Sequence, residues 1–199
     1  MAVWEVAKSV GGATIGHTEL SSLSGAVTFG TGTGDDRISQ AYDHLWLVAS
    51  ARTNVNADWY SAINVRVGNG SLDTGTNYST CWLGTGGNGT WGWSDTGIAY
   101  WTAGYITGNR NDPTPGLKIF GNYNLWLPYY SNTSHFKQSL GHAQGENTSS
   151  TDSQWSVSDV AGLWQSTAAI DTISVYPSAS GYSFKTYSSF TLYGITGSS

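Results

Sequence analysis

Short stretches in which apolar and polar residues alternate constrain the fold of this chain more than any other feature of its sequence. Two such stretches close the chain, at residues 169–177 and 189–195. A period of two, built from β-branched and aromatic residues, predicts a β-strand. The two strands, joined by a Pro/Ser/Gly turn, are expected to close a sheet whose other strands lie upstream. The expected sheet-closing core residues are Ile170, Ile173, Val175, Phe190, Leu192 and Tyr193.

Similar short segments occur throughout the chain. The segment at 42–52 has apolar residues on both faces near Trp46, which predicts a central strand covered on both sides. Pro128 predicts an edge strand or a bulge, since proline cannot donate a ladder hydrogen bond. The remaining predicted strands are 3–10, 26–29, 62–68, 78–83, 91–93, 98–105, 117–120, 125–130, 135–140 and 155–157.

Glycine-rich and polar stretches separate these segments. Residues 84–90, 109–116 and 141–152 predict loops, and residues 158–163 favour a helical turn. Many short strands at spacings of about 8–12 residues are typical of β-sandwiches and jelly rolls. The expected fold is therefore all-β, a single antiparallel jelly-roll or β-sandwich domain over residues 25–199. Residues 1–24 are expected to form an N-terminal arm or a peripheral strand.

The composition excludes several classes of function. Only 8 of 199 residues are Lys or Arg, and they are scattered, so no basic stripe for nucleic acid exists. No apolar run approaches the roughly 18 residues of a membrane span. The start of the chain lacks the basic and apolar regions of a secretory signal, which predicts synthesis in a cytoplasm. The single Cys81 excludes an internal disulfide and is expected to be a small buried hydrophobe.

The polar residues do not form a recognisable catalytic or metal-binding pattern. The four histidines lack the short fixed spacings of a zinc site. Asp35 and Asp36, beside Gly and Thr, are candidate calcium ligands, and the alternative is a hairpin loop with solvated acids. No pair of carboxylates suits glycoside hydrolysis. We therefore expect no cofactor and no enzymatic activity.

The aromatic residues are the main candidates for contacts with a partner or ligand. The chain contains 10 Trp and 12 Tyr. Aromatic side chains on the rim of a sandwich stack on sugars or anchor protein interfaces. The alternative is that most of them fill the core. The candidates are Trp91, Trp93, Tyr100, Trp101, Tyr129 and Tyr130.

Several motifs resemble a group of tailed-bacteriophage virion proteins that carry a β jelly roll ending in Leu-Tyr-Gly-Ile. They occur in the same order at residues 42–52, 64–70, 76–79, 164–170, 173–175 and 191–195. The sequence departs from the group at Val67-Gly68, where Phe-Asn is common, and in a longer turn at residues 70–73. The resemblance implies a non-enzymatic jelly roll on a phage particle, on the capsid or near the tail.

Low charge and many aromatic residues also suit an obligate subunit interface. With the resemblance, this favours a capsid decoration (cement) protein that binds the major capsid protein lattice as a homo-oligomer, with a trimer favoured. The alternatives are a tail-tip, tail-spike or head-fibre component that contacts the host surface, and a carbohydrate-binding module. The expected location is the virion, with partner contacts made by the N-terminal arm and by loops such as 84–93 and 109–116.

Overall fold

Twelve β-strands make up the regular structure of the computed structural model, which describes residues 12–30, 37–55, 60–87, 89–109, 119–146 and 155–196. These residues contain no helix. The strands are β1 (Gly12–Glu19), β2 (Val27–Phe29), β3 (His44–Ala51), β4 (Tyr60–Gly68), β5 (Tyr78–Gly86), β6 (Gly89–Ile98), β7 (Trp101–Thr107), β8 (Gly121–Pro128), β9 (Lys137–Glu146), β10 (Trp155–Trp164), β11 (Thr172–Pro177) and β12 (Ser189–Ile195).

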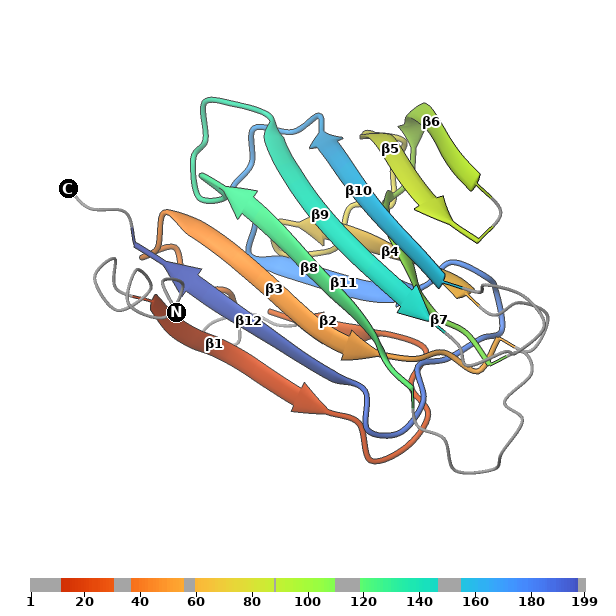
Figure 1. Cartoon of the computed structure of the whole chain (residues 1–199). Helices are drawn as coiled ribbons and strands as arrows, with labels where there is room; N and C mark the ends of the chain where they lie inside the picture. The colour runs from red at the N-terminus through yellow and green to blue at the C-terminus, as the bar shows by residue number, and fades with distance from the viewer. Residues whose placement is uncertain are drawn as a thin grey trace.

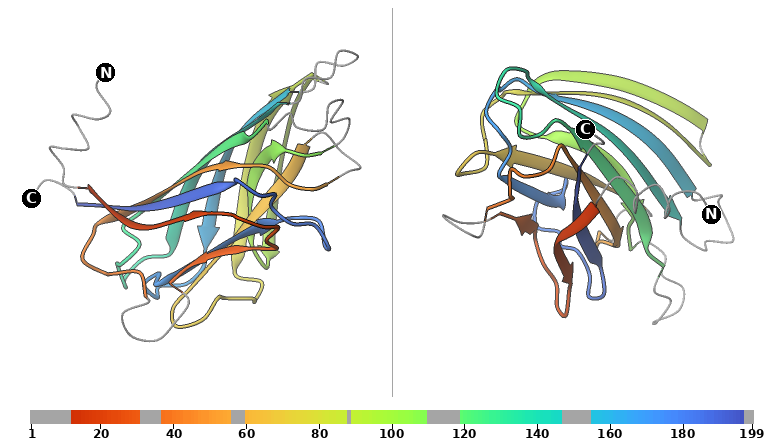
Figure 2. Two further views of the ribbon diagram at one scale, coloured as in Figure 1. Left: turned by 90° about the horizontal axis from the view of Figure 1, so that it is seen from below. Right: turned by 90° about the vertical axis from the view of Figure 1, so that its left-hand side faces the viewer.

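The strands form two antiparallel sheets that pack face to face as a sandwich (Figure 1). The large sheet has eight strands in the order β1-β12-β3-β8-β9-β10-β5-β6, and the small sheet has four in the order β2-β11-β4-β7. Figure 2 shows the two sheets as separate layers. The prediction of an all-β antiparallel sandwich is confirmed.

The strand pairing is nested, which is the topology of a jelly roll. β1 pairs with β12, β2 with β11, β3 with β8, and β4 with β7. Two hairpins are inserted into this plan, β5–β6 between β4 and β7, and β9–β10 between β8 and β11. Both hairpins extend the same side of the large sheet. The last two strands, β11 and β12, therefore lie in different sheets, and the expectation that they close one sheet together is wrong.

The core lies between the two sheets and follows the period-two pattern of the sequence. In β3 the inward Leu45 and Leu47 are fully buried, whereas the intervening Trp46 and Val48 are only half-buried. Burying one such aliphatic side chain contributes about 1.5–3 kcal/mol. Trp46 thus lies on the outer face of the large sheet, which the described residues leave uncovered, so the prediction of a strand covered on both sides is wrong.

Three segments predicted as loops or a helical turn are strands. β5 and β6 run through most of 84–90, β9 continues to Glu146, and β10 includes residues 158–163. Glycines occur within these strands because the two sheets pack closely there. A Cβ on Gly145 would lie 2.9 Å from the backbone carbon of Ile106, and one on Gly162 would lie 2.7 Å from the Trp101 ring. Glycine here makes room for a neighbour instead of turning the chain.

Other boundaries also differ from the prediction. Ile119 and Phe120 precede β8 and are not in a strand. Pro128 ends the central strand β8, so it marks neither an edge nor a bulge. In the N-terminal region, β1 is an edge strand of the large sheet, and the strand predicted at 3–10 lies outside the described residues. No helix in the described part of the chain is long and apolar enough to cross a membrane.

Candidate interaction surface

The outer face of the large sheet carries a row of apolar side chains that crosses six adjacent strands. Residues of this row on neighbouring strands lie directly opposite one another. From β12 to β5 the row consists of Tyr193, Trp46, Trp126, Leu140, Ala161 and Cys81. Leu140 is 60% exposed, and so is Leu83, two residues along β5 from Cys81. Neighbouring exposed apolar side chains of this kind mark contact sites.

Aromatic rings cluster at one end of this row and form what we call the aromatic patch, defined by His44, Trp46, Trp126, Tyr129 and Tyr193. The His44 ring lies 5.0 Å from Trp126 and 4.8 Å from Tyr129, between ring centroids. Trp46 lies 5.8 Å from Tyr193. The backbone N–H of Tyr129 donates to His44 Nδ1 at 3.1 Å, and Tyr129 has a φ of 47°. This turn holds the Tyr129 ring against His44 while leaving it 63% exposed.

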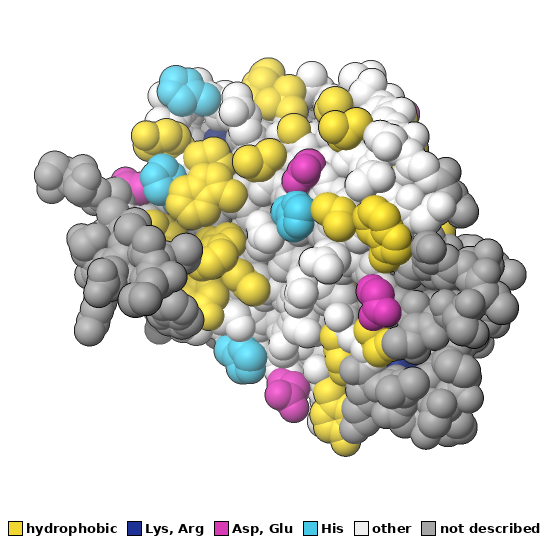
Figure 3. Space-filling view, viewed as in Figure 1, with side chains coloured by type: hydrophobic (Ala, Val, Ile, Leu, Met, Phe, Trp, Pro, Cys, Tyr) yellow, Lys and Arg dark blue, Asp and Glu magenta, His cyan; other side chains and the backbone are white. Residues whose placement is uncertain are grey.

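Positive charge is nearly absent from the same face. Figure 3 shows yellow apolar groups spread across it, with a few acidic and histidine side chains and almost no dark blue. Lys137, the one Lys or Arg in the described part of the large sheet, is 2% exposed and donates to two backbone carbonyls. His142 and Asp159 form an exposed pair at 2.8 Å. The face is therefore apolar and weakly acidic, which suits a protein partner and not a polyanion.

A second aromatic group lies on the inner side of the β5–β6 hairpin and is called the tryptophan cluster. Trp82 contacts Trp91, Trp93 and Tyr105, with ring centroids 5.9, 5.7 and 4.9 Å away. The Trp91 ring lies over Gly84 and Gly86, where a Cβ would come within 2.8 and 2.7 Å of it. The indole N–H groups of Trp82 and Trp91 are buried without a hydrogen-bond partner. Trp93 is 38% exposed at the margin of this cluster.

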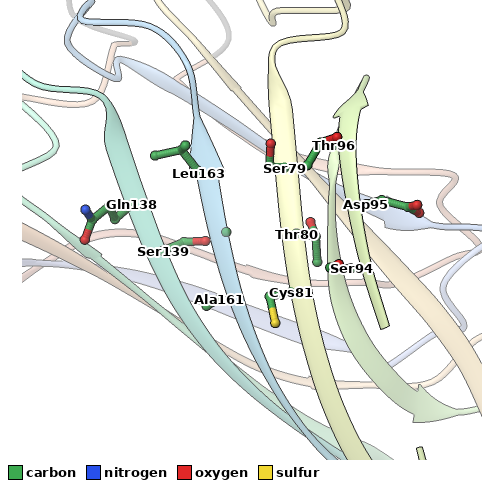
Figure 4. A pocket seen from close by; sticks show the side chains of 11 residues that line it. Ser79, Thr80, Cys81, Ser94, Asp95, Thr96, Gln138, Ser139, Ala161 and Leu163 are labelled. Atoms are coloured by element: carbon green, nitrogen blue, oxygen red, sulfur yellow. The ribbon is translucent and has the colours of Figure 1, made fainter. Parts of the chain in front are cut away.

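A shallow depression with a volume of about 350 Å³ lies over β9, β10, β5 and β6. It is lined mainly by small side chains (Figure 4), among them Ser79, Ser94, Cys81 and Ala161. Cys81 is exposed, so the prediction of a buried cysteine is wrong, because the neighbouring Trp82 takes the inward position. Asp95 is the one acidic residue along the depression, and its side chain points away from the other lining side chains (Figure 4), so the depression lacks a paired acid and base.

The structure separates the six aromatic residues predicted to make contacts. Trp91 and Trp93 meet in the tryptophan cluster, and Tyr129 belongs to the aromatic patch. Tyr100 is half-buried against Tyr176, with ring centroids 6.4 Å apart. For two of the six the prediction is corrected, because their rings fill the core and are not accessible to a partner: Trp101 is 1% exposed and Tyr130 is 0% exposed.

The aromatic patch contains residues that the prediction missed, namely His44, Trp46 and Trp126. The alternation in residues 44–51 is the signal that would have found them, because Trp46 falls opposite the face of Leu45 and Leu47. Of the expected sheet-closing residues, Tyr193 lies on the outer face with Trp46. The other five, Ile170, Ile173, Val175, Phe190 and Leu192, are 0% exposed in the core.

Several residues of the sequence motifs have structural roles. The Asp73 carboxylate accepts hydrogen bonds from the Trp164 indole, the Asn77 amide and the Gly75 N–H at 2.7, 2.9 and 2.8 Å. Burial raises the pKa of Asp73, but these hydrogen bonds outweigh burial and hold the pKa below its ordinary value. The Tyr78 hydroxyl lies 2.9 Å from the Val67 carbonyl oxygen, and burial raises its pKa well above the ordinary range. These groups hold the turn before β5.

Among the described residues, no group of three or more His, Cys, Asp and Glu is placed to hold a metal ion. The candidate calcium ligands Asp35 and Asp36 lie outside the described residues. The outer face of the large sheet and the tryptophan cluster are thus the two candidate surfaces for contact with a partner or ligand.

No protein-family model matches the chain, and no curated protein matches it in sequence.

Proposed function

We propose that this protein is a non-enzymatic structural component of a tailed-phage virion, and specifically a decoration protein that binds the capsid lattice through the outer face of its large sheet. The observation that supports this most directly is the apolar row across six strands, with no exposed Lys or Arg among the described residues of that sheet. The resemblance of the motifs to phage virion proteins supplies the biological setting.

The shape and chemistry of the face fit a broad protein contact. An eight-stranded sheet is a rigid platform, and its aromatic patch offers Trp and Tyr side chains, which are enriched at the centres of protein interfaces. The jelly roll is a common architecture of viral capsid domains. A decoration protein needs such a surface and needs no reactive site. A homo-oligomer, with a trimer expected from the sequence, would seat several copies of the face on one lattice.

Quantitative mass spectrometry of purified virions tests the assignment. We expect a copy number comparable with that of the major capsid protein. Absence from the particle, or a copy number far below that of the capsid protein, would contradict a decoration role.

A binding assay tests the surface. Particles lacking the protein are incubated with purified variants, and occupancy is measured by sedimentation and gel densitometry. Leu140→Glu places a charge in the middle of the apolar row and is expected to lower affinity at least about tenfold. Ser180→Glu adds the same charge at an exposed turn and should bind like the unmodified protein. Equal binding of both variants would exclude the outer face.

The tryptophan cluster favours a second candidate function, contact with host-surface glycans by a tail or head-fibre component. Its basis is Trp93, which is 38% exposed beside Trp82 and Trp91, because sugar rings stack on exposed indoles. Binding of the purified protein to host cells or to a glycan array should be lost on Trp93→Ala. Indifference of the unmodified protein to both would remove this candidate.

A further inference from the structure

In the described part of the chain four strands form the edges of the two sheets, and three of them have features that prevent pairing with another chain. β2 is only three residues long. β7 is almost entirely buried and contains a register shift opposite Ile63 and Asn64. β1 has a register shift between Thr14 and Gly16 and carries His17 and Glu19. Short length, bulges, burial and charge are the devices by which proteins protect exposed sheet edges.

β6, the fourth edge, has none of these devices over most of its length. It has ten residues, of which eight are exposed and two are intermediate. Its pairing with β5 is regular from Gly89 to Thr96, and the one register shift follows that stretch. It contains no Lys, Arg or Pro, and its single charge is Asp95. A long, regular edge presents free N–H and C=O groups, which is a template for another strand.

We propose that β6 pairs antiparallel with β6 of a second copy of this chain across a two-fold axis. The two large sheets then join into one continuous sheet of sixteen strands, twice the eight in each copy. A two-fold contact uses the same strand on both copies, so one unprotected edge satisfies both partners. This inference is independent of the virion assignment. The trimer expected from the sequence would require a different surface.

Among the registers that put an inner residue of β6 on the two-fold axis, the side chains favour one. Trp93 is paired with the inward-facing Trp82, so its side chain lies on the inner side of β6. Trp91 and Asp95, two residues away in either direction, lie on the same side. With the axis at Trp93, the Trp93 residues of the two copies lie opposite each other, and Asp95 of each copy lies opposite Trp91 of the other. An axis at Asp95 would set two carboxylates opposite each other, which is destabilising. An axis at Trp91 would shorten the overlap.

The outer side of β6 fits the same register. With the axis at Trp93, Ser94 lies opposite Gly92 of the second copy, and Thr96 lies opposite Thr90. These side chains are small and uncharged, so two backbones can approach to the strand spacing of about 4.8 Å. The pairing also covers Trp93, a large hydrophobic side chain that is 38% exposed in the single chain.

Light scattering of the purified full chain over a range of concentrations is the first test. We expect a mass twice that of the chain, which is 21.2 kDa. Ser94→Lys adds a charge at an exposed outer position of the edge and should weaken the dimer about tenfold. Its urea unfolding transition, measured at a concentration at which both proteins are monomeric, should stay unchanged. A mass of one or three copies for the unmodified chain would overturn the inference.

Cysteine cross-linking is the second test, in a Cys81→Ser background. Trp93→Cys places two thiols opposite each other at the axis, within the range of Cα separations that a disulfide spans. It should give a covalent dimer under mild oxidation. Thr96→Cys is the matched control, because its two copies lie far apart in this register. Cross-linking of the Thr96→Cys variant ahead of the Trp93→Cys variant would overturn the proposed pairing, whatever the role of the protein in a virion.

Discussion

Gly194, in the Leu-Tyr-Gly-Ile ending of the chain, offers a sharp test of the packing. It lies in β12 and faces Tyr42, which precedes β3. A Cβ on Gly194 would lie 2.3, 2.4 and 2.6 Å from the Cδ2, Cγ and Cε2 atoms of the Tyr42 ring. These atoms include the base of the ring, so rotation about the ring axis relieves little of the overlap. Overpacking of this kind costs about 1–3 kcal/mol.

We therefore expect Gly194→Ala to lower the free energy of unfolding by about 1–3 kcal/mol. For a chain of this size each kcal/mol shifts Tm by about 2–4 °C, so Tm should fall by about 2–12 °C. The matched control is Gly25→Ala, because a Cβ at Gly25 meets no atom within 4 Å. The control should be neutral, or more stable by up to about 1 kcal/mol through the entropy of the unfolded chain.

A double-mutant cycle identifies the cause. Tyr42→Ala removes the ring that the new methyl group would strike. In that background Gly194→Ala should cost less by at least about 1 kcal/mol, measured by urea unfolding with an unchanged m-value. An equal cost of Gly194→Ala with and without the Tyr42 ring would refute the packing argument.

Three further predictions concern charge and packing. The folded state favours the ionised form of Asp73, so the stabilisation by Asp73 is present above the ordinary carboxyl pKa of about 3.9 and is lost as pH falls through the lower folded pKa. Asp73→Asn should therefore flatten the acid side of a plot of unfolding free energy against pH, measured by urea titration. An unaltered plot would contradict this. Tyr78→Phe removes a buried hydroxyl bonded to Val67 and should lower the free energy of unfolding by about 1–3 kcal/mol in urea titrations, and no loss would count against that role. In the same measurement Leu47→Ala in the core should lower the free energy of unfolding by about 2–5 kcal/mol, and Leu140→Ala on the outer face should lower it by less than about 0.5 kcal/mol. Equal losses would show that the apolar row stabilises the fold.

Local sequence pattern predicted many of the strands correctly. The alternation at 42–52, 62–68 and 189–195 corresponds to β3, β4 and β12 within a few residues. These strands have one face in the core, and a half-buried strand must alternate. Glycine-rich strands were missed because the pattern does not show whether a glycine turns the chain or admits a neighbour. Gly145 and Gly162 admit β7, which becomes their neighbour only when the sheets pack.

The candidate contact residues show the same limit. Tyr129 and Tyr130 are adjacent, yet one is 63% exposed and the other is buried, since a turn with positive φ sends their rings in opposite directions. Trp46 and Trp126 are 80 positions apart in sequence and become opposite neighbours through the pairing of β3 with β8. Local pattern indicates which side a residue takes, and long-range pairing determines which residues share that side.

The sequence by itself determined that this chain is an all-β sandwich, because period-two alternation and frequent turns leave no other way to bury its apolar residues. Only the tertiary structure decided which strands pair, which sheet each strand joins, and that β6 forms an unprotected edge. Those choices depend on contacts between residues far apart in the chain, whose free energy is gained only when both sheets are present. For the same reason the apolar row of the outer face is a property of the assembled sheet and of no single strand.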